Sequence, residues 1–256
     1  MRILAVGDVV GTSGLECLRA KLPMLKKENK IDLCVVNGEN SSDGNGITPS
    51  SAEHIFVSGA DVITTGNHAY RRKEMYEYFD DNEFVIRPAN YSENNPGRGV
   101  CVVDMGRCSV CVINLMGNMY MADSLDNPFH TIDRLLDEYS ENRIILVDFH
   151  AETTSEKRAM AFYLDGRVSA LFGTHTHVQT ADECVLKNAT GYITDLGMVG
   201  TIDSVLGVKP QIIIDKFKYN MPARFDFFKG PASLCGCIFE IDDRTGKTIS
   251  VERICI

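Results

Sequence analysis

Two histidines one residue apart, His175 and His177, follow an apolar run over residues 169–172. The run predicts a short buried strand, and alternate residues of a strand project to the same side, so we expect both imidazoles on one face. In open α/β sheets, ligands bind at the carboxyl ends of the strands. Two imidazoles at such an edge could bind a metal ion, although a chance pair of surface histidines would give the same pattern.

Polar side chains follow four more apolar runs in the same way. They are Asp8 after residues 3–6, Glu39 and Asn40 after 33–36, Asn67 and His68 after 62–65, and His150 after 144–147. Five strand ends that each carry a potential ligand or acid–base group predict one shared site. The mixture of carboxylates, carboxamides and imidazoles favours iron, manganese or zinc over calcium and magnesium, which prefer oxygen ligands. Because the candidates exceed the needs of one ion, we expect two ions bridged by a carboxylate, an arrangement that binds phosphate esters.

Helical patterns alternate with these strands, which is typical of a largely parallel sheet covered by helices. Leucines at positions 15, 18, 22 and 25 have helical spacing. Thr48-Pro49 predicts the start of a second helix that ends at Gly59, and Asn127-Pro128 predicts the start of another. Thr153 and Glu156 could form a capping box for a further helix. Right-handed crossovers would bring the first three strand ends to one edge.

The remaining segments predict β-structure and one long loop. Residues 100–103 and 110–115 read as a hairpin, and residues 116–129 form a loop that could be a lid over a binding site. Near the C-terminus, strands are predicted over residues 224–228, 234–241 and 249–256. We find no repeat, linker or charge run, so the prediction is a single domain over residues 1–256.

Charge and cysteine content restrict the environment and the partners. The net charge of −9 argues against stable binding of duplex nucleic acid through its backbone. The nine cysteines lie mostly within apolar runs and form no zinc-binding spacing, which predicts reduced thiols in a cytoplasmic protein. The first apolar run is too short for a signal peptide, and no run is long enough to span a membrane. The sequence leaves the oligomeric state open, a homo-oligomer included.

Four motifs together resemble the calcineurin-like metallophosphoesterases. They are Gly7-Asp8, Gly66-Asn67-His68, His150 and Gly173-Thr174-His175-Thr176-His177. The sequence departs from the superfamily at three places, with Val10 in place of a histidine, Glu39-Asn40 in place of the second motif, and Ala69 in place of an acid. With these departures, the sequence is similar over the whole chain to the YmdB-like bacterial phosphodiesterases. The similarity includes the runs G-D-V-V-G at residues 7–11 and D-F-H-A-E-T-T-S-E-K at 148–157.

This resemblance implies an α/β fold, an αββα sandwich of two mixed sheets flanked by helices, with two metal ions that are often iron. It implies a metal-dependent phosphodiesterase in which a metal-bridging hydroxide attacks cyclic nucleotides, especially 2′,3′-cyclic ones, and a 3′-nucleotide is released. Carried over by motif, one ion would be held by Asp8, Glu39, Asn40 and His177, and the other by Glu39, Asn67, His150 and His175. Glu39 would be the bridge, and His68 would protonate the leaving oxygen.

Other functions remain open at this point. A phosphomonoesterase or protein phosphatase would use the same motifs, because it binds the same phosphoryl group. A regulatory protein could use the metal site to sense a nucleotide without turnover, although sensing needs no proton donor such as His68. Asp148 shares a strand face with His150, and it could orient that imidazole or instead bind neighbouring backbone.

Overall fold

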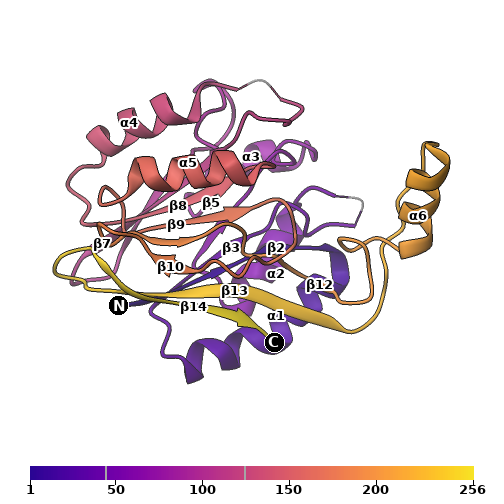
Figure 1. The fold of residues 1–256 in the computed structure, drawn as a ribbon, viewed down its shortest axis with the longest axis horizontal. Coiled ribbons are helices and arrows are strands. Elements are labelled where there is room, and N and C mark those ends of the chain that lie inside the picture. The colour runs from indigo at the N-terminus through magenta and orange to yellow at the C-terminus, as the bar shows by residue number, and fades with distance from the viewer. Residues whose placement is uncertain (44, 124) are drawn as a thin grey trace.

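The computed structural model describes residues 1–43, 45–123 and 125–256 and contains two stacked sheets between layers of helices (Figure 1). Within these residues the first sheet has eight strands, in the order β2 (Asp8–Val9), β12 (Met198–Thr201), β13 (Ala232–Ile241), β1 (Arg2–Val6), β3 (Leu33–Asn37), β4 (Val62–Thr64) and β5 (Val85–Ile86), with β14 (Thr248–Cys255) paired to β13. The second has six, in the order β10 (Cys184–Val185), β11 (Gly191–Ile193), β9 (Ala170–Thr174), β8 (Ile144–His150), β7 (Ser109–Met116) and β6 (Val100–Asp104).

Both sheets are mixed, with a parallel centre. Strands β1, β3, β4 and β5 run parallel, as do β7, β8, β9 and β11. Antiparallel neighbours flank each parallel set, β13 beside β1 in the first sheet and β6 and β10 at the margins of the second. The predicted αββα sandwich is therefore confirmed, and the ends of the parallel strands from both sheets point the same way.

Alternation along the strands produces the layers. In β1, Leu4 and Val6 face the helices, whereas Ile3 and Ala5 face the second sheet. Buried side chains such as Phe172 from the second sheet meet them between the sheets. Each parallel strand is thus covered on both faces, which explains why its sequence is continuously apolar.

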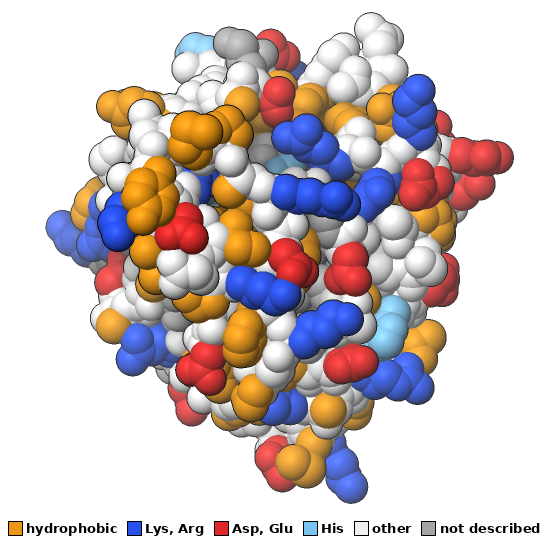
Figure 2. All heavy atoms as spheres, turned by 90° about the vertical axis from the view of Figure 1, so that its right-hand side faces the viewer, with side chains coloured by type: hydrophobic (Ala, Val, Ile, Leu, Met, Phe, Trp, Pro, Cys, Tyr) orange, Lys and Arg blue, Asp and Glu red, His pale blue; other side chains and the backbone are white. Residues whose placement is uncertain are grey.

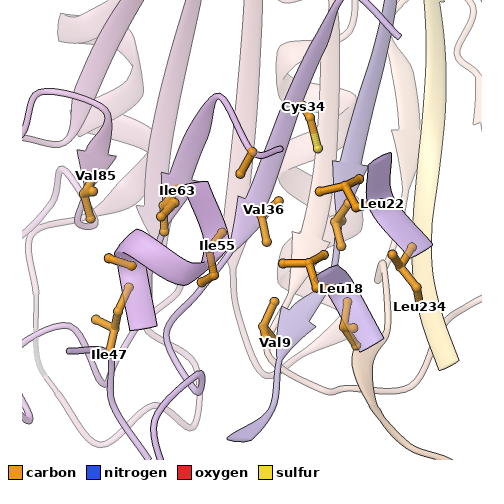
Figure 3. Close-up of a cluster of buried hydrophobic side chains, with 14 of the residues drawn as sticks. Val9, Leu18, Leu22, Cys34, Val36, Ile47, Ile55, Ile63, Val85 and Leu234 are labelled. Carbon is orange, nitrogen blue, oxygen red and sulfur yellow. The ribbon is translucent and has the colours of Figure 1, made fainter. Parts of the chain in front are cut away.

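Helices cover the outer faces. α1 (Gly11–Glu28), α2 (Pro49–Ser58) and α3 (Met75–Asp81) pack against the first sheet, where leucines of α1 and the side chain of Ile55 fill the cluster in Figure 3. α4 (Pro128–Glu138) and α5 (Thr154–Leu164) pack against the second sheet. α6 (Pro210–Tyr219) lies beyond the carboxyl ends of the strands, at the right of Figure 1.

Local signals set most helix boundaries. Thr48 and Ser51 form a reciprocal capping box at α2, and Gly59 ends that helix with a left-handed φ of 115°. The box predicted at α5 is only half formed. The Thr153 side chain accepts a hydrogen bond from the Glu156 amide at 3.3 Å, but the Glu156 carboxylate instead accepts from the Asn118 amide at 2.9 Å. Glu156 therefore anchors the loop after β7.

One expectation about the chain after β12 was wrong, and one helix there was not predicted. Residues 224–228 do not form a strand, and only Phe227 makes an isolated bridge, to Val208. The preceding residues contain α6, which periodicity at Ile213, Ile214 and Phe217 could have indicated. In the described part of the chain, no helix has the length and apolar character to cross a membrane. The single domain over residues 1–256 stays a prediction.

Candidate metal centre

The strand ends of both sheets bring the eight singled-out side chains into one contact network. Asp8 lies in β2, Glu39 and Asn40 follow β3, Asn67 and His68 follow β4, His150 ends β8, and His175 and His177 follow β9. Asp8, Glu39 and His150 are completely buried. The first sheet supplies the carboxylates and carboxamides with His68, and the second sheet supplies the other three imidazoles.

Glu39 lies at the centre of this network. Its Oε1 accepts a hydrogen bond from Asn40 Nδ2 at 2.9 Å and lies 3.1 Å from His68 Nδ1. Its Oε2 accepts from the His68 backbone amide at 3.1 Å and lies 3.3 Å from His150 Nε2. Each carboxylate oxygen therefore faces a different imidazole.

The imidazoles complete two groups around Glu39. His150 Nε2 lies 2.9 Å from Asn67 Oδ1 and 3.0 Å from His175 Nδ1. The potential ligand atoms of Glu39, His150 and His175 all lie within 4.8 Å of one another, so this cluster could hold a metal ion. On the other side of Glu39, His177 Nε2 lies 3.3 Å from Asn40 Nδ2 and 3.6 Å from Asp8 Oδ1.

The two histidines of the H-x-H motif do not lie on a strand, contrary to the sequence prediction. β9 ends at Thr174, and both histidines have left-handed backbones, with φ of 98° at His175 and 63° at His177. Asp195 stabilises this strained turn, because its carboxylate accepts hydrogen bonds from the Thr176 amide at 3.2 Å and the Thr176 hydroxyl at 2.7 Å. The turn, and not strand alternation, directs both rings into the site.

The charge states of the carboxylates follow from their neighbours. Burial raises the pKa of Glu39, but the charges and hydrogen bonds of His150 and His68 outweigh burial and hold that pKa well below its usual range. Burial likewise raises the pKa of Asp8, and His177 reverses the effect, so that the pKa is lowered. Both carboxylates are therefore ionised at neutral pH, although they are buried.

The pKa values of the imidazoles are shifted in opposite directions. Burial lowers the pKa of His150, but the charges of Glu39, Asp8 and Asp148 raise it to about 9. Burial and the charge of His150 lower the pKa of His175 to about 3. His175 is thus neutral at pH 7, the form in which an imidazole can bind a metal ion, whereas His150 must lose a proton before it can coordinate a cation.

Unsatisfied polar atoms fit the proposal of a bound cation. Asp8 Oδ1 and His177 Nδ1 are buried and have no hydrogen-bond partner among the described residues. A buried, ionised carboxylate oxygen without a donor is costly unless a cation binds it. Together with the convergent atoms of Glu39 and His150, the donor set suits a transition metal.

Asp148 orients His150, which resolves the two roles left open by the sequence. Thr174 Oγ1 lies 2.9 Å from His150 Nδ1 and donates a hydrogen bond to Asp148 Oδ1 at 2.7 Å. Thr64 and Asn37 from the first sheet also donate to Asp148. This chain fixes the ring so that Nε2 points to Glu39, as outer hydrogen-bond partners of metal ligands do.

Gly66 is required by close packing in the G-N-H motif. A Cβ atom at this position would lie 2.3 Å from His150 Nε2 and 2.4 Å from Glu39 Oε2. These contacts are far inside van der Waals distance, and the neighbours are the side chains at the centre of the site. Any larger residue would displace Glu39 or His150.

Two features of the site were missed in the sequence. The carboxylate of Glu152, half exposed and two residues after His150, lies 3.0 Å from His175 Nε2. The site also opens into a cavity of about 800 Å³ whose far wall comes from residues 205–227. Among the described residues, the loop over 116–129 that was predicted as a lid does not line this cavity.

Comparisons with known proteins agree with this architecture. A 2′,3′-cyclic-nucleotide 2′-phosphodiesterase of Bacillus subtilis (strain 168) is 44% identical over 257 residues, which cover 100% of this chain and 97% of that protein. The crystal structure of a novel phosphatase from Mycoplasma pneumoniae superposes with a TM-score of 0.95 at 34% identity, covering 100% of this chain and 93% of that one. A hypothetical protein from Thermus thermophilus gives a TM-score of 0.94 at 37% identity, covering 100% of this chain and 99% of that one. A family model described as YmdB-like protein matches residues 4–254, and the chain therefore belongs to the YmdB-like family.

Proposed function

We propose that the chain is a metal-dependent phosphodiesterase that hydrolyses cyclic nucleotides, with 2′,3′-cyclic nucleotides as substrates and 3′-nucleotides as products. The observation that carries this proposal is the position of Glu39, whose two oxygens face His68 and His150 at 3.1 and 3.3 Å. The relative from Bacillus subtilis is named for this substrate class. The chain is accordingly a phosphoester hydrolase.

The donor atoms divide into two sets that share Glu39. Asp8, Glu39, Asn40 and His177 would hold one ion, and Glu39, Asn67, His150 and His175 would hold the other. Iron is the metal we propose, with manganese or zinc as alternatives, because imidazole and carboxylate ligands suit these ions. When bound, two such ions supply an activated water at neutral pH and neutralise charge on the phosphoryl oxygens.

His68 supplies the proton for the leaving oxygen. Its Nδ1 lies 2.9 Å from Asn40 Oδ1 and 3.1 Å from Glu39 Oε1, which fix the ring. Its Nε2 has no hydrogen-bond partner among the described residues, and the side chain lines the cavity. The ribose 2′ oxygen is a poor leaving group as an alkoxide, so protonation by this imidazole lowers the barrier to its departure.

A phosphomonoesterase is the second candidate, because the matched Mycoplasma pneumoniae structure is that of a novel phosphatase. The cavity favours the diesterase, since its wall at residues 205–227 is mainly apolar and suits a nucleoside better than it suits the surface of a phosphoprotein. A protein that senses a nucleotide without turnover needs no proton donor, so the sensing function gives His68 no role.

A substrate panel on the metal-loaded protein tests the proposal. The panel contains adenosine 2′,3′-cyclic phosphate, adenosine 3′,5′-cyclic phosphate, 3′-AMP, a 4-nitrophenyl monoester and a phosphopeptide. We expect the highest kcat/KM for the 2′,3′-cyclic diester, with 3′-AMP as its product and no further hydrolysis. A preference for the monoester or phosphopeptide would replace the diesterase with a phosphatase, and no turnover of any ester would favour a sensor.

A further inference from the structure

The cavity above the metal centre has two chemically different walls. One wall consists of strand-end residues, among them Glu39, His68 and His177. The opposite wall comes from the excursion between β12 and β13, and its apolar members include Val205, Leu206, Val208, Ile213, Phe217 and Phe225. Figure 1 places this excursion beyond the carboxyl edge of both sheets. Figure 2 shows that face, where hydrophobic side chains lie among charged side chains of both signs.

The phenylalanines of this wall have different surroundings. Phe227 is partly buried, with its ring close to Gly207 and Gly11. Phe225 remains 48% exposed and Phe217 75% exposed, although both line the cavity. Large apolar side chains that stay exposed beside a polar site mark a surface for a ligand. Phe227 is therefore part of the scaffold, and Phe225 is free to contact a ligand.

Charge makes the same wall suitable for an anionic ligand. Lys216 Nζ lies 4.8 Å from the centroid of the Phe225 ring, which holds the ring by a cation–π contact. Lys216 and Arg224 line the cavity, whereas the chain as a whole carries a net charge of −9. The two cations would thus help to attract an anionic molecule such as a nucleotide into the cavity despite the acidic surface elsewhere.

We propose that Phe225, with Lys216 against its ring, binds the base of the nucleotide substrate and makes the segment over residues 205–227 the specificity wall of the enzyme. The inference rests on the proposed phosphodiesterase function, since the scissile phosphate must lie at the opposite wall. A cavity of about 800 Å³ falls within the range of small-molecule sites. Stacking on a phenyl ring uses the π-face that every base has, so the wall selects nucleotides over other diesters and tolerates all four bases.

Tyr219 offers a matched control for Phe225. It is an aromatic residue at the end of α6, it is 59% exposed, and Lys218 Nζ lies 5.1 Å from its ring centroid. Among the described residues it is absent from the cavity lining. An effect at Phe225 that Tyr219 does not share therefore reports the cavity and not a general loss of surface aromatics.

The experiment compares Phe225→Ala, Phe225→Leu and Tyr219→Ala in the metal-loaded enzyme. The substrates are adenosine 2′,3′-cyclic phosphate and methyl ribofuranoside 2,3-cyclic phosphate, which has the same cyclic ester and no base. Because stacking on an aromatic side chain contributes about 1–3 kcal/mol per base, Phe225→Ala should lower kcat/KM for the nucleotide about 5- to 140-fold, mainly through KM. Phe225→Leu should lose less, and Tyr219→Ala should be unchanged. For the substrate without a base, all three variants should match wild type.

Equal losses on both substrates, no loss on either, or the same loss in Tyr219→Ala would overturn the base subsite. Calorimetric binding of 3′-AMP and of ribose 3-phosphate provides a readout that needs no turnover. We expect Phe225→Ala to weaken only the binding of 3′-AMP. If wild type hydrolyses neither cyclic ester, the proposed function fails, and the calorimetric comparison still decides whether Phe225 binds a base.

Discussion

Replacement of His68 by alanine removes the proposed proton donor while leaving the anchoring of Glu39 largely intact. The His68 backbone amide donates to Glu39 Oε2 at 3.1 Å, and this contact survives the substitution. Asn40 Nδ2 still donates to Glu39 Oε1 at 2.9 Å. Metal content should therefore stay near wild type, and any loss of rate should come from the missing imidazole.

The size of the loss depends on the leaving group. General acid catalysis contributes about 10²–10⁴-fold, so kcat for a 2′,3′-cyclic nucleotide should fall by roughly that factor, or about 3–5 kcal/mol of transition-state stabilisation. A nitrophenolate departs without a proton, so a nitrophenyl diester should lose much less. The assay measures kcat for both substrates together with metal content, and His130→Ala, an exposed histidine in α4, serves as the control.

Equal losses on the two substrates would refute the reasoning, because they would show that His68 holds structure or phosphate and is not the acid. Loss of a metal ion in His68→Ala would instead make His68 a ligand. A wild-type rate on the cyclic nucleotide would remove it from the mechanism.

Further substitutions, with matched controls, test the centre of the site. Glu39→Gln should reduce bound metal and abolish turnover, because a neutral amide cannot bridge two cations as a carboxylate does, whereas Asn40→Ala should lose less of both. Elemental analysis and kcat compare the two variants, and wild-type metal content in Glu39→Gln would contradict the bridging role. Gly66→Ala places a Cβ 2.3 Å from His150 and should lower kcat at least about 100-fold, as misplacement of catalytic groups does; an unchanged rate would show that the site yields without cost. Thr174→Val removes the hydroxyl between Asp148 and His150 and should weaken metal affinity about 10–100-fold in a metal titration. Thr190→Val changes a buried threonine outside the site and should leave metal affinity at the wild-type value. Equal effects of the two substitutions would refute the orienting role of Thr174.

The strand ends and helix caps could be predicted because their signals are local. Thr48 and Gly59 each act on backbone within a few residues, and the structure confirms the predicted start and end of α2. The polar residues after each apolar run converge because parallel strands place their carboxyl ends at one edge, which is a rule of topology. These two kinds of signal were enough to predict that the eight candidate residues lie close together.

The geometry of the H-x-H turn required tertiary contacts that no local pattern contains. His175 and His177 adopt left-handed backbones held by Asp195, which lies about 20 residues further along the chain and pairs with the buried Lys157 at 2.6 Å. The sequence predicted correctly that both rings lie on the same side, but it attributed this to strand alternation and not to the turn. Glu152 was missed for a related reason, since its contact with His175 depends on where that turn places the ring.

The segment after β12 was misread because apolar content outweighed periodicity. Residues 224–228 contain three phenylalanines, which favour a strand by composition. In the structure Phe225 and Phe227 line a cavity, and among the described residues the segment pairs only through the isolated bridge between Phe227 and Val208. The pattern at Ile213, Ile214 and Phe217 was a helical signal, and Pro210 at its start was a boundary signal for α6.

The dependence of turnover on bound metal tests the central claim most directly. Protein stripped with a chelator is titrated with ferrous iron or manganese under anaerobic conditions, and metal per chain and hydrolysis of adenosine 2′,3′-cyclic phosphate are measured on the same samples. We expect no activity without metal and a rise that reaches its maximum as loading approaches two ions per chain. Full activity in the stripped protein, or no activity at any loading with any of the proposed metals, would contradict the account.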